Sequence, residues 1–132
     1  MILDASAIIS ILRGENDAPQ MAQAVARAAE RRTSVVTYVE AAVVIDSSRD
    51  PVSSRRLDDF FGEAQIRVEP VTIEQGEIAR QAYRDFGKGR HRASLNFGDC
   101  FAYALARARR EPLLFKGDDF CHTDVEPALN SE

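Results

Sequence analysis

The stretch MILDASAIISIL, residues 1–12, decides the fold of this chain. It opens with three apolar residues that suit a short buried strand, and after a carboxylate it continues as an apolar run with helical spacing. A strand that passes at once into a helix predicts the strand–helix alternation of α/β proteins. Asp4 stands at the junction, where a charge among apolar residues needs a physical reason.

Composition and length narrow the class of protein. The chain has 132 residues, 45% of them hydrophobic and 29% charged, with a net charge of −4. These values are typical of a soluble globular protein, and no apolar run approaches the ~20 residues of a membrane span or forms a signal-peptide core. We therefore expect one domain over residues 1–132, a cytoplasmic location and no membrane association. Cys100 and Cys121 form no CxxC pair and are poor zinc ligands.

Short β-type runs alternate with helical runs along the whole chain. The expected strands are residues 2–3, 33–36, 66–71 and 112–115, with an edge strand near Val125. The expected helices are residues 6–12, a run from a cap at 16 or 17 to about 30, 39 to about 48, 55–64, 73–86 and 97–109. Pro51 is read as part of a turn. The alternation predicts an α/β protein with a mostly parallel sheet covered on both faces.

Carboxylates follow the expected strands at similar places. Asp4 follows the first strand and Glu40 comes just after the second. Asp99 lies in the first turn of the helix at 97–109, and Asp118 and Asp119 follow the last strand. Because the carboxyl ends of parallel strands meet at one edge of a sheet, we expect these acids to come together there.

Helix capping explains each acid taken alone. Asp4 suits the N-cap of the first helix, and Thr37-x-x-Glu40 and Asn96-x-x-Asp99 both have capping-box spacing. A cap contributes about 1 kcal/mol to helix stability. Taken together, the acids indicate a cation site, because carboxylates gathered in one place repel one another unless a cation lies among them.

Mg²⁺ or Mn²⁺ suits such a cluster of oxygen ligands. A divalent ion lowers the pKa of a bound water, orients it toward a phosphodiester and neutralises the developing charge. The sequence places no Ser–His or Cys–His pair nearby, which favours metal-assisted attack on phosphate esters over covalent catalysis. Ser6 is expected to hold a carboxylate or a metal-bound water, with a hydrogen bond to its own backbone as the alternative.

Four segments resemble PIN-domain ribonucleases of the VapC toxin family. They are MILDASAIISIL, TSVVTYVEAAVVI, LNFGDCFAYALA and PLLFKGDDF, and their order and spacing extend over nearly the whole chain. The resemblance implies a PIN-like three-layer α/β/α sandwich and Mg²⁺- or Mn²⁺-dependent endonucleolytic cleavage of RNA. It also implies a toxin restrained by a VapB-type antitoxin, and a homodimer.

The family's acidic constellation falls on Asp4, Glu40, Asp99 and one acid of the GDDF segment. Asp4 and Asp99 are then the metal ligands. The acid directly before Phe120 is Asp119, while Asp118 reaches the same pocket after a small rotation of the turn, so the sequence leaves both open.

Two polar residues support these acids. Ser6 matches the family's small hydroxyl residue two positions after the first Asp, and Asn96 pairs with Asp99 in the capping box. Ala5 stands where Thr is frequent in the family, which leaves the acids unaffected.

A basic strip, RDFGKGRHR at residues 84–92, precedes the helix that carries Asp99. Phosphate-backbone binding needs flexible cations beside the cleavage centre, which assigns RNA contact to Lys88, Arg90, His91 and Arg92. A solvated loop is the alternative. The aromatic residues are expected in the core or a dimer interface, namely Phe60, Phe61, Tyr83, Phe97, Phe101 and Tyr103.

Two other functions compete with a ribonuclease toxin. A phosphatase of the haloacid-dehalogenase type also has an early Asp, but it needs a second Asp two residues later, where this chain has Ser6. A PIN-like module that binds RNA or protein without cutting is expected to lose its acids, and here they are present.

Overall fold

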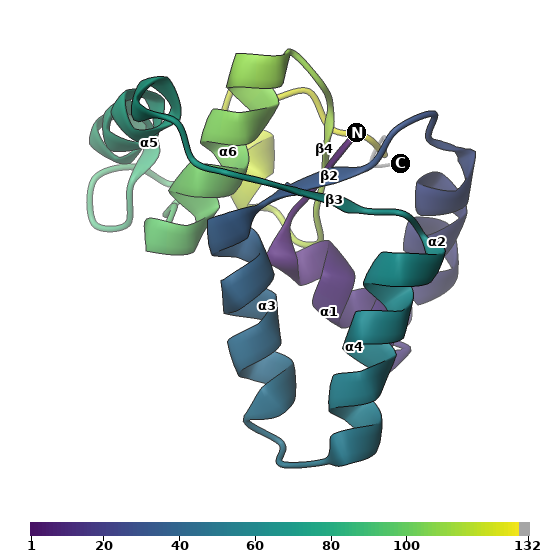
Figure 1. Ribbon diagram of the computed structural model, residues 1–132. Helices are drawn as coiled ribbons and strands as arrows, with labels where there is room; N and C mark the ends of the chain where they lie inside the picture. The colour runs from purple at the N-terminus through teal and green to yellow at the C-terminus, as the bar shows by residue number, and fades with distance from the viewer. Residues whose placement is uncertain (130–132) are drawn as a thin grey trace.

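Four short strands pair in parallel in the computed structural model, which describes residues 1–129 (Figure 1). Their order across the sheet is β3 (Arg67–Glu69), β2 (Arg32–Ser34), β1 (Ile2–Leu3) and β4 (Leu113–Leu114). Ile2 is opposite Arg32 on one side and Leu113 on the other. The first strand of the chain therefore lies inside the sheet, and all strands end at the same edge.

Helices connect and cover the strands. In the described part of the chain they are α1 (Ala5–Arg13), α2 (Ala18–Arg27), α3 (Val35–Asp46), α4 (Pro51–Glu63), α5 (Ile73–Phe86), α6 (Phe97–Arg109) and the short 3₁₀ helix η1 (Asp119–His122). No helix among residues 1–129 is both long and apolar enough to cross a membrane.

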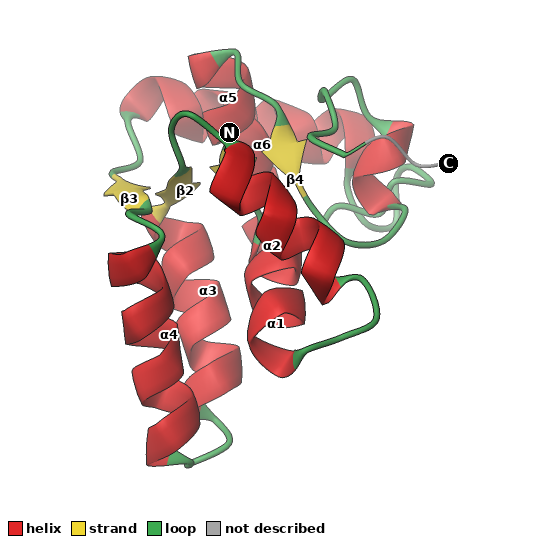
Figure 2. Cartoon of the chain, turned by 90° about the vertical axis from the view of Figure 1, so that its right-hand side faces the viewer, coloured by secondary structure: helices red, strands yellow, loops and turns green. Residues whose placement is uncertain are grey.

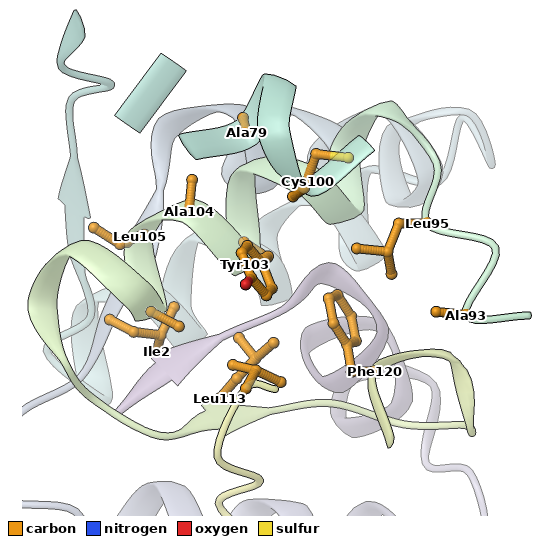
Figure 3. Close-up of a cluster of buried hydrophobic side chains, with 14 residues drawn as sticks. Ile2, Ala79, Ala93, Leu95, Cys100, Tyr103, Ala104, Leu105, Leu113 and Phe120 are labelled. Atoms are coloured by element: carbon orange, nitrogen blue, oxygen red, sulfur yellow. The ribbon is translucent and has the colours of Figure 1, made fainter. Parts of the chain in front are cut away.

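The sheet separates two hydrophobic clusters because successive strand residues point to opposite faces. Ile2 and Leu113 face α5 and α6, and Figure 3 shows them gathered with Tyr103 and Phe120. Leu3 and Leu114 belong to the other cluster, which is built from α1, α2, α3 and α4. The predicted three-layer α/β/α sandwich with a parallel sheet is confirmed.

The helices on the second face do not all lie flat against the sheet. In Figures 1 and 2, α3 and α4 run side by side and project away from the strands, joined by a short loop. Since α1 starts directly after β1 and α3 directly after β2, the first turns of both helices lie at the carboxyl edge of the sheet.

Several expected boundaries are wrong for local reasons. The sequence predicts Val35 and Val36 as strand residues, yet the Ser34 side chain accepts a hydrogen bond from the Val36 N–H and starts α3 there. The Thr37–Glu40 capping box is therefore wrong as well, because Thr37 is buried inside the helix. Pro51 begins α4 as its N1 residue rather than forming a turn.

Other boundaries agree closely with the sequence. Helix α6 spans residues 97–109 with the Asn96–Asp99 capping box in place, and Thr72 caps α5 by accepting from the Gln75 N–H. The edge strand expected near Val125 is wrong, since the neighbouring Pro127 makes only an isolated bridge to Leu113.

Candidate active site

Asp4 occupies the end of β1 and the N-cap of α1. Its Oδ2 accepts the Ser6 N–H at 3.1 Å and the Ser6 Oγ–H at 2.6 Å. Its Oδ1 is buried and has no hydrogen-bond partner among the described residues. Burial raises the pKa of this carboxyl, although the Ser6 hydrogen bonds oppose the shift. One oxygen thus serves the helix cap and the other remains available to a ligand.

Glu40 reaches the same region from α3. Its carboxylate lies directly against Gly98, where an added Cβ would clash with Oε2. Burial, followed by the charges of Asp4 and Asp99, raises the pKa of Glu40 to about 7. Only a residue without a side chain at position 98 lets Glu40 occupy this position.

Asp99 is held by the first turn of α6. Its Oδ2 accepts the Asn96 N–H at 3.0 Å, and its own N–H donates to Asn96 Oδ1 at 2.9 Å. Burial raises the pKa of Asp99 to about 6, with further contributions from the negative charges of Asp4 and Asp119. The capping box therefore fixes Asp99 beside the other acids. For this residue, a role in helix capping and a role in the acidic site are compatible.

The last acids lie in the segment after β4. Asp119 opens η1, and its charge raises the pKa of both Asp4 and Asp99. Asp118 precedes η1, and its backbone carbonyl accepts the Cys121 N–H at 3.1 Å. Of the pair that the sequence left open, Asp119 is the one whose charge acts on the other acids.

The carboxylates of Asp4, Glu40, Asp99 and Asp119 come from four segments, and neighbouring acids of this group contribute to the raised pKa values of Asp4, Glu40 and Asp99. Within residues 1–129, no three Asp, Glu, His or Cys side chains stand close enough together to hold a metal ion as arranged. Mutual repulsion between carboxylates favours such separation. The donor set fits a hard divalent cation, since all donors are oxygens and the buried Oδ1 of Asp4 has no other partner.

The basic strip begins in the last turn of α5 and continues into the loop between α5 and α6. Lys88, Arg90 and Arg92 are exposed, and the Arg90 guanidinium lies 5.3 Å from the centre of the Tyr83 ring. His91 is half-buried, and its Nδ1 accepts the Ala93 N–H at 3.0 Å. Lys88, Arg90 and Arg92 thus face solvent, whereas His91 also stabilises the loop.

Sequence reasoning missed two residues of this region. Gly98 gives no signal beyond being a small residue next to an acid, and its role depends on where α3 places Glu40. Lys116 donates its backbone N–H to Ser6 Oγ at 3.0 Å and thereby joins the segment after β4 to the Asp4 corner. Both contacts join segments far apart in the chain, so neither is visible in a local pattern.

Comparisons with known proteins agree with this architecture. A sequence profile of the PIN domain matches residues 1–126. Ribonuclease VapC28 of Mycobacterium tuberculosis is 58% identical over 131 residues, which is 98% of each chain. The crystal structure of M. tuberculosis VapC20, a sarcin–ricin loop cleaving toxin, superposes with a TM-score of 0.72 at 17% identity, covering 96% of this chain and 98% of that one. A chain of a toxin–antitoxin complex from Klebsiella pneumoniae superposes with a TM-score of 0.70 at 16% identity, covering 93% of this chain and 92% of that one.

The raised carboxyl pKa values predict how stability depends on pH. Between about pH 5 and pH 7.5 the folded protein binds more protons than the unfolded chain, because Glu40 and Asp99 titrate near 7 and 6 when folded. The free energy of unfolding of metal-free protein should therefore fall as the pH rises through this window. Solvent screening limits the loss to about 1–2 kcal/mol, or roughly 3–8 °C in Tm.

Thermal unfolding in EDTA across this pH window measures the effect. Glu40→Gln should flatten the slope and raise the Tm at pH 7.5, because the neutral amide no longer repels Asp4 and Asp99. Glu77→Gln, on an exposed position of α5, is the matched control and should keep the wild-type slope. A Tm that rises with pH in wild-type protein would contradict the arrangement.

Proposed function

This chain belongs to the PIN-domain family, among the VapC ribonucleases, and from that premise we propose that its acidic site binds a divalent cation and cleaves RNA. It is the toxin of a type II toxin–antitoxin pair, acting on RNA phosphodiester bonds as an endoribonuclease in the cytoplasm. The observation that carries the metal assignment is the buried Oδ1 of Asp4, which lacks a partner among residues 1–129. Membership of the PIN family excludes the alternative of a haloacid-dehalogenase-type phosphatase.

Asp4 and Asp99 are the proposed ligands of Mg²⁺ or Mn²⁺, because both are fixed by hydrogen bonds at the starts of helices. When bound, the ion supplies charge neutralisation at the phosphate and a water of lowered pKa. Glu40, with a pKa of about 7, accepts a proton from the attacking water at its carboxylate. Asp119 completes the anionic cluster, and Ser6 holds the Asp4 carboxylate in place.

The basic strip positions the RNA backbone. Lys88, Arg90 and Arg92 are exposed in the loop that leads into α6, a few residues before Asp99. Cations beside the acids offset the repulsion between a phosphate chain and the carboxylates. We assign His91 to the same surface, where its ring, packed edge-on against Phe86 at 5.3 Å, also sets the shape of the loop.

A VapB-type antitoxin is the proposed inhibitor. Charge complementarity favours an antitoxin segment that places a basic side chain among the carboxylates and so competes with the cation. A binding partner of this kind masks the same acids that the reaction needs, which accounts for inhibition without a second regulatory site.

We also propose a homodimer through an apolar surface beside the acids. Val35, Val39 and Val43 form an exposed stripe on α3, and Phe97 at the start of α6 is 75% exposed. Phe97 lies between a depression of about 550 Å³ along this stripe and a second one of about 410 Å³ between α5 and α6. A projecting aromatic ring next to an apolar groove is self-complementary, as a twofold interface requires.

Removing either proposed metal ligand should abolish cleavage. In Mg²⁺ or Mn²⁺, Asp4→Asn and Asp99→Asn should cut RNA at least about 100-fold more slowly than wild type, because each removes a negatively charged ligand. Both variants should remain folded, since Asn retains an oxygen that accepts the capping hydrogen bonds. Asp58→Asn, exposed on α4, is the control and should cut normally. Tight RNA binding by wild type without metal-stimulated cleavage would instead indicate a non-catalytic binding module.

Gly98→Ala separates activity from stability. The new Cβ displaces the Glu40 carboxylate, so cleavage should fall about tenfold or more. Stability should hold or rise by up to about 1 kcal/mol, because Ala favours a helix over Gly. Gly62→Ala is the control, since a Cβ at that helical glycine meets no atom within 4 Å. Equal losses of activity in both variants would contradict the role of Gly98.

The dimer surface is tested by charge insertion. Val39→Asp and Phe97→Asp should each shift the protein to monomers in analytical ultracentrifugation, because a carboxylate would be desolvated in the interface. Val52→Asp provides the control, since Val52 is 66% exposed on α4 and lies outside the proposed surface. Wild-type protein that sediments as a monomer at all concentrations would overturn the homodimer.

A further inference from the structure

The segment between β4 and η1 carries Asp119 and is tied down by Lys116. The Lys116 backbone N–H donates to Ser6 Oγ at 3.0 Å, and the same hydroxyl donates to Asp4 Oδ2 at 2.6 Å. The Lys116 ammonium lies 2.8 Å from Glu15 Oε1 and 3.5 Å from Asp17 Oδ1. One residue thus connects the segment to the Asp4 corner and to the loop after α1.

The acids that receive Lys116 are themselves fixed. Gly14 ends α1 in a left-handed conformation, with φ of 63°, and the following Glu15 N–H donates to the Ser10 carbonyl at 3.1 Å. Asp17 Oδ1 accepts the hydroxyl of Ser10 at 2.6 Å, and Ser10 is fully buried. Lys116 is therefore paired with acids in a turn that is itself held by hydrogen bonds to Ser10.

A second anchor lies just beyond the acids. Phe120 is 3% exposed and its ring is 5.2 Å from that of Phe115. Between the two anchors, Gly117 has φ of 94°, which allows the sharp turn. Asp119 is exposed inside this short tether, and its charge acts unfavourably on Asp4 and Asp99. Repulsion pushes the turn away from the site, and the anchors hold it there.

We propose that Lys116 is a positioning residue whose ion pairs with Glu15 and Asp17 hold the Asp118–Asp119 turn beside Asp4 in readiness for a divalent cation. The idea rests on the proposed function, since it assumes that these acids bind metal. Lys116 touches neither the metal nor the reacting phosphate in this role. It acts through the position of Asp119 and through the hydroxyl of Ser6.

Deleting the Lys116 charge should change the affinity for metal in the direction opposite to the one expected from electrostatics alone. A lysine near an anionic site repels a cation, so deleting its charge should tighten metal binding if charge alone matters. If Lys116 instead holds the turn in place, deleting it should weaken metal binding despite the lost repulsion. The direction of the change therefore decides between the two.

The first experiment measures Mn²⁺ binding by electron paramagnetic resonance. Lys116→Met should weaken binding about tenfold, a loss typical of residues that orient metal ligands. Lys116→Arg keeps the ion pairs and should stay within about threefold of wild type. Arg13→Met removes an equal charge from an exposed position beside the same loop, and it should bind Mn²⁺ no more weakly than wild type. Raised Mn²⁺ should restore RNA cleavage by Lys116→Met, which a folding defect would prevent.

A second experiment does not depend on metal. Hydrogen exchange of metal-free protein should be faster at residues 118–123 in Lys116→Met and in the double variant Glu15→Gln/Asp17→Asn, with α5 unchanged. Unchanged exchange together with equal or tighter Mn²⁺ binding in Lys116→Met would overturn the proposal. If wild-type protein binds no Mn²⁺, the proposed function fails instead, while the exchange result still tests the tether.

Discussion

The burial of Asp4 at the end of β1 is the constraint on which the structure depends. β1 has only two residues, and their apolar side chains point to opposite faces of the sheet. The strand ends there, and the chain passes directly into a helix. The carboxylate that follows is 3% exposed, and Ser6 satisfies one of its oxygens. A single residue therefore ends the strand, caps the helix and leaves one buried oxygen without a partner among residues 1–129.

Helix capping and the proposed metal binding make compatible demands on the acids of this site. The N-terminus of a helix offers unpaired N–H groups that stabilise a carboxylate in its charged form. Asp4 and Asp99 both take such positions, on α1 and α6, and both keep raised pKa values because burial outweighs these hydrogen bonds. Acids that are fixed in place yet costly to ionise form a site that a cation stabilises. The capping explanation accounts for where the acids lie, and the proposed cation would offset the cost of ionising them.

The PIN fold is retained in solved structures with 16% and 17% identity to this chain. Such conservation of fold without conservation of sequence is expected when a fold depends on alternation and burial rather than on particular residues. Some exposed side chains do not belong to this scaffold. The exposed cations of the basic strip and the exposed Phe97 contribute little to the core, which makes them the residues on which the proposed RNA and dimer contacts rely.

The sequence by itself determined the α/β class and the helix at 97–109, because strand length, capping and apolar spacing are local properties. It also predicted the acids at 4, 40, 99 and 118 or 119 as site residues. It misplaced the start of α3, since Ser34 overrode the strand preference of two valines. Only the tertiary structure placed Glu40 against Gly98 and joined Lys116 to the loop after α1. These contacts connect residues far apart in the chain, and the distances between them depend on how the sheet and helices assemble.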